Sequence, residues 1–175
     1  MYRAVFLDRD GVINKESDAY IKSWNEFEFL PGSKEAIALL TKNNYTTFVI
    51  TNQSGLTRGL ITEASLLDIH RQMTAEIEQA GGKITEIYYC GHHPDDGCEC
   101  RKPNTGMLES AVKDYGISLP DSYVVGDKPL DIEMGKRAGC TTILVRTGYG
   151  TDYEGPKPDA VADDLLAAAK LIIIV

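Results

Sequence analysis

Short apolar runs alternate with segments of helical character along most of the chain, and this alternation constrains the fold more than any other feature. The apolar runs are three to six residues long, and β-branched residues dominate several of them, for example 46–50, which is typical of buried strands. The segments between them carry apolar residues at helical spacing. Strand–helix–strand units favour a mostly parallel sheet with helices on both faces. We therefore predict an α/β protein with a Rossmann-like, three-layer α/β/α architecture.

The expected strands span residues 4–7, 46–50, 84–89, 123–125 and 142–145. The expected helices span residues 33–43, 62–80, 105–115, 130–138 and 163–171, with Ser33 as the N-cap of the first. Glycines follow three of these helices, as is common at helix ends. No repeat, low-complexity tract or linker divides the 175 residues, so we expect one domain covering 1–175.

The composition narrows the class of protein. The chain has 18 Lys and Arg residues against 26 Asp and Glu residues, a net charge of −8. This balance argues against a nucleic-acid partner, because a phosphate backbone requires a basic face. The apolar runs at both ends are too short for a signal peptide or a membrane span, so we expect a cytoplasmic protein with no membrane partner. Thiols stay reduced in that compartment, which favours metal binding or chemistry over disulfides for the four cysteines.

Polar residues follow four of the expected strands, where a parallel sheet binds its ligands. These segments are Asp8-Arg9-Asp10-Gly11, Thr51-Asn52-Gln53-Ser54, Cys90-Gly91-His92-His93 and Gly126-Asp127-Lys128. Carboxylates that converge at one edge suit Mg²⁺, which prefers hard oxygen ligands. Taken alone, Asp-x-Asp-Gly could also be a simple turn. An EF-hand loop is excluded, because its glycine belongs at position 6 and its glutamate at position 12.

Four short motifs occur in order along the chain. They are Asp8-x-Asp10-Gly11-Val12, Thr51-Asn52, Lys102 within Arg101-Lys102-Pro103, and Gly126-Asp127-x3-Asp131. Together they resemble the four motifs of the haloacid dehalogenase superfamily of phosphotransferases, from about residue 4 to residue 147. The resemblance implies that superfamily's fold and a phosphatase that forms an aspartyl-phosphate. It implies that Asp8 is the nucleophile and that Asp10 is the general acid and base.

The resemblance also assigns the groups that neutralise phosphate charge, which is the main task in phosphoryl transfer. It implies that Mg²⁺ is held by Asp8, the backbone carbonyl of Asp10, and Asp127. Thr51 and Lys102 would bind the reacting phosphate, and Asp131 would orient Lys102 or the loop rather than bind the metal directly. Outside the set of motifs, the same threonine and lysine would be a strand-terminal hydroxyl and a solvated surface charge.

Three of the four cysteines and two of the three histidines lie within residues 90–100. The candidate ligands are Cys90, His92, Cys98 and Cys100. Zinc favours such a Cys₃His set, and a site without an open position is structural. His93 is the alternative to His92, and a loop of reduced thiols is the alternative to a metal site. Cys140 lies apart and is expected in the core. A zinc ion in this loop would help to position Arg101 and Lys102, which follow it directly.

The zinc loop with C-x-C-R-K-P narrows the resemblance to the branch with histidinol-phosphate phosphatases and D-glycero-D-manno-heptose 1,7-bisphosphate 7-phosphatases. The run T-N-Q-S-G-L-T-R-G at 51–59 and segments 17–20 and 30–33 resemble the heptose enzymes. This implies hydrolysis of the C7 phosphate, giving heptose 1-phosphate for lipopolysaccharide or another glycoconjugate. Histidinol phosphate is the alternative substrate, and a non-catalytic, zinc-stabilised binding module is the alternative from another class. A polynucleotide phosphatase is disfavoured by the net charge of −8.

A sugar bisphosphate needs cations for two phosphates. We expect Lys102 and Mg²⁺ at the reacting phosphate, and Arg101, helped by Lys128, at the distal one, because Arg binds phosphate bidentately. The role of Arg58 stays open. The other expected substrate-binding residues are Ser17, Asp18, Tyr20, Asn52, Gln53 and Ser54. Little chain remains between the first two strands for a large cap domain, so loop 15–20 is expected to select the substrate. Nothing in the sequence requires more than a monomer.

Overall fold

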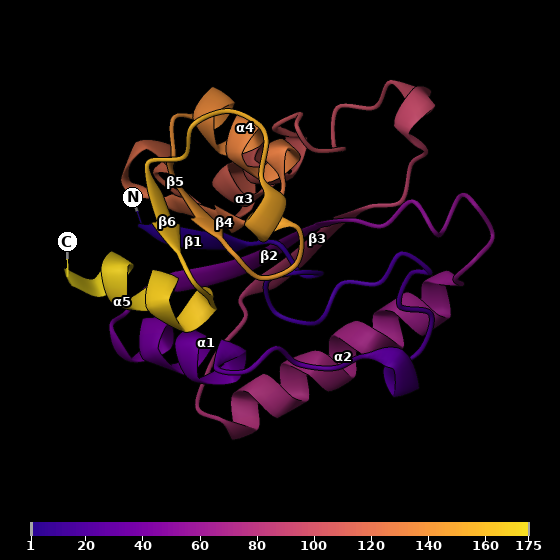
Figure 1. Cartoon of the computed structure of the whole chain (residues 1–175), viewed down its shortest axis with the longest axis horizontal. Coiled ribbons are helices and arrows are strands. Elements are labelled where there is room, and N and C mark those ends of the chain that lie inside the picture. Colours follow the sequence, from indigo (N-terminus) through magenta and orange to yellow (C-terminus); the bar gives the residue numbers. More distant parts are fainter. Residues whose placement is uncertain (1, 175) are drawn as a thin grey trace.

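One six-stranded parallel sheet forms the centre of the molecule in this computed structural model, which describes residues 2–174 (Figure 1). The strand order is β3-β2-β1-β4-β5-β6. The strands are β1 (Ala4–Leu7), β2 (Thr46–Asn52), β3 (Glu86–Cys90), β4 (Tyr123–Gly126), β5 (Thr141–Val145) and β6 (Ala160–Ala162). All five strand pairings are parallel, so the carboxyl ends of the strands lie along one edge of the sheet.

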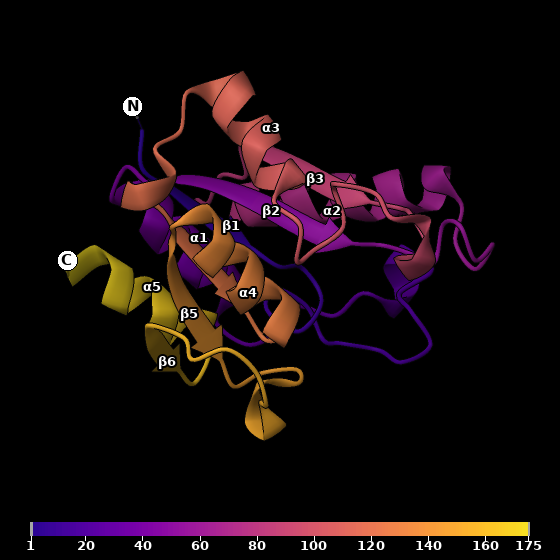
Figure 2. The same ribbon diagram turned by 90° about the horizontal axis from the view of Figure 1, so that it is seen from above.

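Helices cover both faces of the sheet, which confirms the predicted three-layer architecture (Figures 1 and 2). The five α-helices are α1 (Ser33–Lys42), α2 (Glu63–Gln79), α3 (Gly106–Tyr115), α4 (Pro129–Ala138) and α5 (Leu165–Ile174). Four 3₁₀ turns, Trp24–Glu26, Pro94–Asp96, Leu119–Asp121 and Gly150–Asp152, lie in the connections. None of the helices in residues 2–174 combines the length and the apolar composition that a membrane crossing requires.

The two faces of the sheet bury separate apolar cores, because successive side chains of a strand point to opposite sides. Val5 and Leu7 of β1 pack in a core with residues of α1, α2 and α5. Ala4 and Phe6 pack in a second core with residues of α3 and α4, and Cys140 is also buried there, as expected. The near-continuous apolar run of β1 is therefore required by burial on both faces.

Several predicted boundaries need correction. Gly32, not Ser33, occupies the N-cap of α1 with φ of +78°, and the Ser33 hydroxyl instead donates to the Leu30 carbonyl. The third strand begins at Glu86 rather than at residue 84, and the last helix runs from Leu165 rather than from residue 163. The short edge strand β6 was not predicted. Between β1 and β2 the structure has only one 3₁₀ turn and α1, and the loop around residues 15–20 borders the cavity described below.

The topology brings the predicted motifs together. β1 lies between β2 and β4, so the segments that follow these three strands are neighbours. Asp8 follows β1 directly, and its backbone N–H donates to the Val125 carbonyl of β4 at 3.1 Å. Asn52 ends β2, and Asp127 follows β4 directly. The sheet order therefore places the three motifs at one site.

Candidate active site

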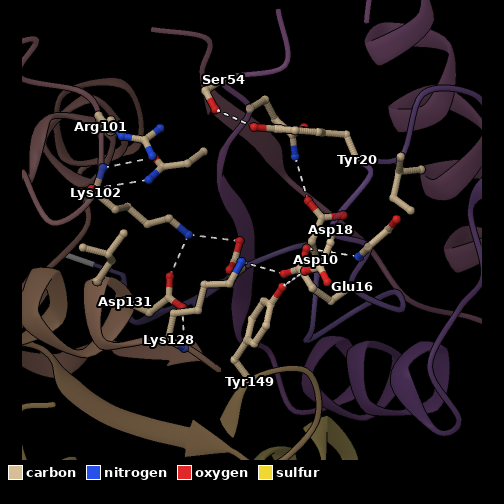
Figure 3. Close-up of a pocket in the computed structure, with 16 residues that line it drawn as sticks. Asp10, Glu16, Asp18, Tyr20, Ser54, Arg101, Lys102, Lys128, Asp131 and Tyr149 are labelled. Carbon is tan, nitrogen blue, oxygen red and sulfur yellow. Dashed lines mark hydrogen bonds and ion pairs between the residues drawn. The ribbon is translucent and has the colours of Figure 1, made fainter. Parts of the chain in front are cut away.

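A cavity of about 270 Å³ opens at the carboxyl edge of the sheet (Figure 3). All eight predicted substrate-binding residues line it: Ser17, Asp18, Tyr20, Asn52, Gln53, Ser54, Arg101 and Lys128. Asp8, Asp10 and Lys102 line it as well. Arg58 is exposed on the loop after β2 and does not line the cavity. The cavity is therefore lined by most of the residues that the sequence analysis assigned to catalysis or substrate binding.

Three buried carboxylates, Asp8, Asp127 and Asp131, have an oxygen of each within 4.8 Å of the others. Asp8 and Asp131 line the cavity, whereas Asp127 lies beside them without lining it. Burial and the charge of Asp131 raise the pKa of Asp8 to about 7. Burial and the charge of Asp8 raise the pKa of Asp127 to about 8. Three carboxylates this close repel one another, so the site favours a cation among them.

The residues at this point fit a hard divalent ion such as Mg²⁺. The Asp127 Oδ1 atom is buried and has no hydrogen-bond partner among the described residues. The Asp127 carboxylate lies close against Gly11, where a Cβ would be 2.2 Å from Oδ2 and 3.0 Å from Oδ1, so a glycine is needed for this approach. A buried carboxylate oxygen without a hydrogen-bond partner, close to other acidic groups, is a suitable ligand for a hard divalent cation.

Lys102 is the cation that the fold itself supplies. Its Nζ lies 3.0 Å from an Asp8 oxygen and 2.6 Å from an Asp131 oxygen, and it donates to the Ile50 carbonyl at 3.1 Å. Burial alone would lower the pKa of this ammonium, but Asp131 and Asp8 raise it above its usual value. Lys102 is therefore charged and fixed beside the Asp8 carboxylate.

Asp10 has its own set of donors. Its carboxylate accepts from Arg9 Nη2 at 2.9 and 3.1 Å, from Asn14 Nδ2 at 2.9 Å and from Gln53 Nε2 at 2.8 Å. Burial works against the charge, but Arg9, Asn14 and Gln53 outweigh it and lower the pKa of Asp10. Asp8 and Asp10 are two residues apart, yet their surroundings shift their pKa values in opposite directions.

Thr51 does not line the cavity. Its hydroxyl is buried and accepts from Gln53 Nε2 at 2.9 Å, the same amide that donates to Asp10. The Gln53 amide therefore joins this hydroxyl to Asp10, and the contact of Thr51 with the reacting phosphate stays a prediction. This arrangement comes from side-chain packing at the end of β2, which the motif does not reveal.

Tyr149 and Glu16 also line the cavity. Tyr149 was not predicted, and Glu16 lies in the loop 15–20 that was expected to select the substrate but was not named as a site residue. The Tyr149 hydroxyl donates to Asp18, and its ring lies 5.1 Å from the Lys128 ammonium (Figure 3). Glu16 accepts from Lys128 Nζ at 2.5 Å. Extending the strand-edge rule to the fifth strand would have found Tyr149, since it lies just beyond β5.

The cysteine-rich loop forms a compact cluster beside the cavity. Cys90, His92, Cys98 and Cys100 offer ligand atoms within 4.8 Å of one another. Two sulfur–nitrogen and two sulfur–sulfur separations lie between 3.2 and 3.6 Å, and the sulfurs of Cys90 and Cys100 are 2.8 Å apart. Tetrahedral zinc with Zn–S bonds of about 2.3 Å needs sulfurs about 3.8 Å apart. Two of the three sulfur pairs, at 3.6 Å, come close to that separation, so the donor set is suited to zinc. His93 lies outside it, where its ring accepts from the Asp95 N–H.

Comparisons with known proteins identify the family of the chain. The HAD-hydrolase-like family model matches residues 99–168. D-glycero-β-D-manno-heptose-1,7-bisphosphate 7-phosphatase of Bordetella bronchiseptica is 43% identical, covering 98% of both chains. The chain belongs to the heptose-bisphosphate phosphatase family of HAD-like hydrolases. The enzyme of that name from Pseudomonas putida is 44% identical, covering 98% of this chain and 99% of its own.

The fold agrees with that of solved members of the heptose-bisphosphate phosphatase family. The B. bronchiseptica D,D-heptose 1,7-bisphosphate phosphatase, solved with magnesium and phosphate, superposes with a TM-score of 0.93 at 42% identity, covering 98% of each chain. The Burkholderia thailandensis enzyme superposes with a TM-score of 0.76 at 33% identity, again covering 98% of each chain. The relatives thus match the chain over nearly its whole length.

Proposed function

We propose that this protein is a magnesium-dependent phosphatase that removes the C7 phosphate of D-glycero-D-manno-heptose 1,7-bisphosphate. The products are heptose 1-phosphate, for nucleotide-activated heptose, and inorganic phosphate. The full-length similarity to enzymes of that name carries the substrate assignment. The names of these relatives specify the β anomer, which we adopt. The buried pair of Asp8 and Lys102 at the base of the cavity supports the chemistry.

In the first half-reaction, an Asp8 oxygen attacks phosphorus and forms an aspartyl-phosphate, while the bond from phosphorus to the sugar oxygen breaks. The Lys102 ammonium, 3.0 Å from Asp8, offsets the charge on the phosphoryl oxygens. Asp10 gives a proton to the departing sugar oxygen. A phosphate dianion beside Asp10 favours the protonated carboxyl, because like charges oppose each other.

In the second half-reaction, Asp10 removes a proton from water, and the water oxygen attacks the phosphorus of the aspartyl-phosphate. The bond from phosphorus to Asp8 breaks, which restores the carboxylate and releases inorganic phosphate. The three donors that lower the pKa of Asp10 favour the ionised form that this step requires. When bound by Asp8, the Asp10 carbonyl and Asp127, Mg²⁺ supplies positive charge to the phosphoryl oxygens and to the acidic cluster.

Arg101 is the proposed ligand of the distal C1 phosphate. Its Nη1 atom is buried and has no hydrogen-bond partner among the described residues, and the side chain lines the cavity. An unpaired guanidinium N–H is costly unless an acceptor arrives, and phosphate is a matching acceptor. Lys128, whose pKa is raised by Asp8 and Glu16 against the effect of burial, supplies a second charge. The remaining lining residues would contact the sugar.

Zinc in the cysteine cluster is proposed to be structural, because four ligands leave no open position. Cys100 precedes Arg101 in the chain, so a closed cluster limits the positions that Arg101 can reach. We also propose that residues 1–175 act as one monomeric domain in the cytoplasm. Reduced thiols able to bind zinc are consistent with that compartment.

The experiment that tests this function compares kcat/KM for three substrates with Mg²⁺: the heptose 1,7-bisphosphate, histidinol phosphate and fructose 1,6-bisphosphate. We expect the heptose substrate to lead by tenfold or more, which is about 1.4 kcal/mol of transition-state binding. A lead by histidinol phosphate would refute the proposed substrate while retaining the reaction class. No turnover of any phosphate ester would refute the reaction class itself.

A further inference from the structure

A fully buried arginine lies next to the proposed general acid. The Arg9 side chain has no exposed surface, and it is the largest of the fully buried side chains in the described chain. Its Nε and Nη2 atoms donate to Asp10, with distances of 3.3 Å from Nε and 2.9 Å from Nη2 to Oδ1. A buried guanidinium needs a counter-charge and hydrogen-bond acceptors for its N–H groups. Asp10 pairs with Nε and Nη2, so Nη1 needs another acceptor.

His70 of α2 satisfies that third nitrogen. Its Nε2 lies 3.1 Å from Arg9 Nη1, and the ring is 5% exposed. Arginine carries only donors, so the histidine nitrogen must accept and the ring must be neutral. Burial and the charge of Arg9 lower the pKa of His70 to about 3, which keeps the ring neutral near pH 7. The contact joins residues that are 61 positions apart in the sequence.

We propose that His70 and Arg9 are positioning residues: the neutral His70 ring holds the Arg9 guanidinium, which in turn fixes the Asp10 carboxylate toward the cavity. The inference rests on the proposed role of Asp10 as general acid and base. Arg9 binds both Asp10 oxygens through Nη2, while Asn14 and Gln53 each bind one. The guanidinium therefore sets the orientation of the carboxylate plane, and α2, anchored in the core, sets the orientation of the guanidinium.

His70→Leu removes the acceptor and leaves a buried Arg9 N–H without a partner. The guanidinium can recover this hydrogen bond by turning toward another acceptor. Because Asp10 is bound to the guanidinium, its carboxylate would move with it, away from the leaving oxygen. His70→Gln keeps an acceptor oxygen at a similar reach and should preserve the arrangement. The two variants differ in the acceptor, so comparing them separates the hydrogen bond from the simple loss of the ring.

The leaving group provides the decisive readout. A sugar or other alkyl oxygen needs a proton as it departs, whereas p-nitrophenolate is stable without one. A misplaced Asp10 should therefore slow the first half-reaction of an alkyl phosphate much more than that of p-nitrophenyl phosphate. The parameter kcat/KM isolates that half-reaction, because it covers only the steps up to release of the leaving group. A merely structural role for His70 would lower both values by the same factor.

The experiment measures kcat/KM for the heptose bisphosphate, or any alkyl phosphate that the wild type turns over, and for p-nitrophenyl phosphate. We expect His70→Leu to lower kcat/KM by about tenfold or more for the alkyl phosphate and by less than about threefold for the aryl phosphate. The larger loss is part of the roughly 10²–10⁴-fold rate enhancement that a general acid supplies. His70→Gln should stay within about threefold of the wild type on both. Ile77→Ala, buried two turns along the same helix, controls for destabilisation and should keep the wild-type ratio of the two substrates.

Equal losses on both substrates, no loss in His70→Leu, or a His70→Gln variant as impaired as His70→Leu would each overturn the positioning role. Thermal unfolding of each variant confirms that the folded enzyme is being assayed. Asp10→Asn separates this test from that of the proposed function. If Asp10→Asn keeps wild-type activity on the alkyl phosphate, the general acid is misassigned. If that variant is impaired on the alkyl phosphate and His70→Leu behaves like the wild type, only the positioning inference fails.

Discussion

Replacing Asp8 by Asn should abolish turnover and stabilise the metal-free protein. Burial and the neighbouring Asp131 raise the pKa of Asp8 from 3.8 to about 7, despite the attraction of Lys102. A pKa shift of one unit corresponds to about 1.4 kcal/mol. At pH 8 the ionised Asp8 carboxylate therefore lowers the free energy of unfolding by up to about 4 kcal/mol. Part of that repulsion is shared with Asp127, so we expect a gain of about 2–4 kcal/mol. In a chain of this size that is roughly 4–16 °C in Tm.

The gain should depend on pH in a defined direction. A carboxyl with a raised pKa in the folded state binds its proton more tightly there than in the unfolded chain. The wild type therefore loses stability as pH rises from about 4 to about 7, and the amide of Asp8→Asn does not. At pH 5 the advantage of the variant should fall to about a third of its value at pH 8, since only about one of three pH units has been crossed.

The assay is thermal unfolding in magnesium-free buffer at pH 5 and pH 8, with zinc content matched between samples. Added Mg²⁺ should raise the Tm of the wild type and leave Asp8→Asn nearly unchanged, since a ligand stabilises only the fold that binds it. Glu35→Gln removes one exposed carboxylate from α1 and serves as the control. It should change the free energy of unfolding by no more than about 0.5 kcal/mol at either pH. A variant no more stable than the wild type at pH 8 would refute the electrostatic reasoning. Phosphate release by Asp8→Asn above about 1% of the wild-type rate would refute the assignment of Asp8 as the nucleophile.

Three further outcomes test other parts of the site. Gly11→Ala should raise the Mg²⁺ concentration needed for half-maximal activity by about tenfold or more, because its Cβ would lie 2.2 Å from the Asp127 Oδ2 atom. Gly59 is also at positive φ, but a Cβ there would have no atom within 4 Å, so Gly59→Ala should leave the required Mg²⁺ concentration unchanged. Arg101→Ala should raise KM for the bisphosphate by about tenfold or more and leave KM for a substrate without the distal phosphate near the wild-type value. Cys98→Ser should lower zinc content well below one ion per chain, measured by metal analysis of protein purified without chelators.

The sequence predicted the parts of the fold that are determined by burial along a single strand. The apolar run of β1 has the predicted boundaries, because both of its faces are covered. The strand β6 escaped prediction, since three small residues carry little signal of their own. It forms because it pairs with β5, as Ile143 opposes Ala160 and Val145 opposes Ala162. Pairing between distant segments has no local pattern.

The same limit applies to the site. The strand-edge rule and the motifs selected most of the cavity lining, because each residue lies at a strand end and needs no partner to be noticed. The contact between Arg9 and His70 has no such signal: a histidine on the buried side of a helix is indistinguishable in sequence from an ordinary core residue. The bond from Gln53 to Thr51 was likewise hidden, since it depends on side-chain directions at the end of β2.

The cysteine cluster and Lys102 are adjacent in sequence but held by different contacts. Lys102 is fixed by Asp8, Asp131 and Ile50 through its ammonium, and its backbone N–H donates to Asn52 at 3.1 Å.

Arg101 retains a buried nitrogen with no partner in the described chain, so its position depends more on the loop that precedes it. Loss of zinc should therefore weaken distal phosphate binding more than the chemical step. In Cys98→Ser we accordingly expect KM for the bisphosphate to rise several times more than kcat falls. A collapse of kcat with unchanged KM would show that zinc instead positions Lys102 for chemistry.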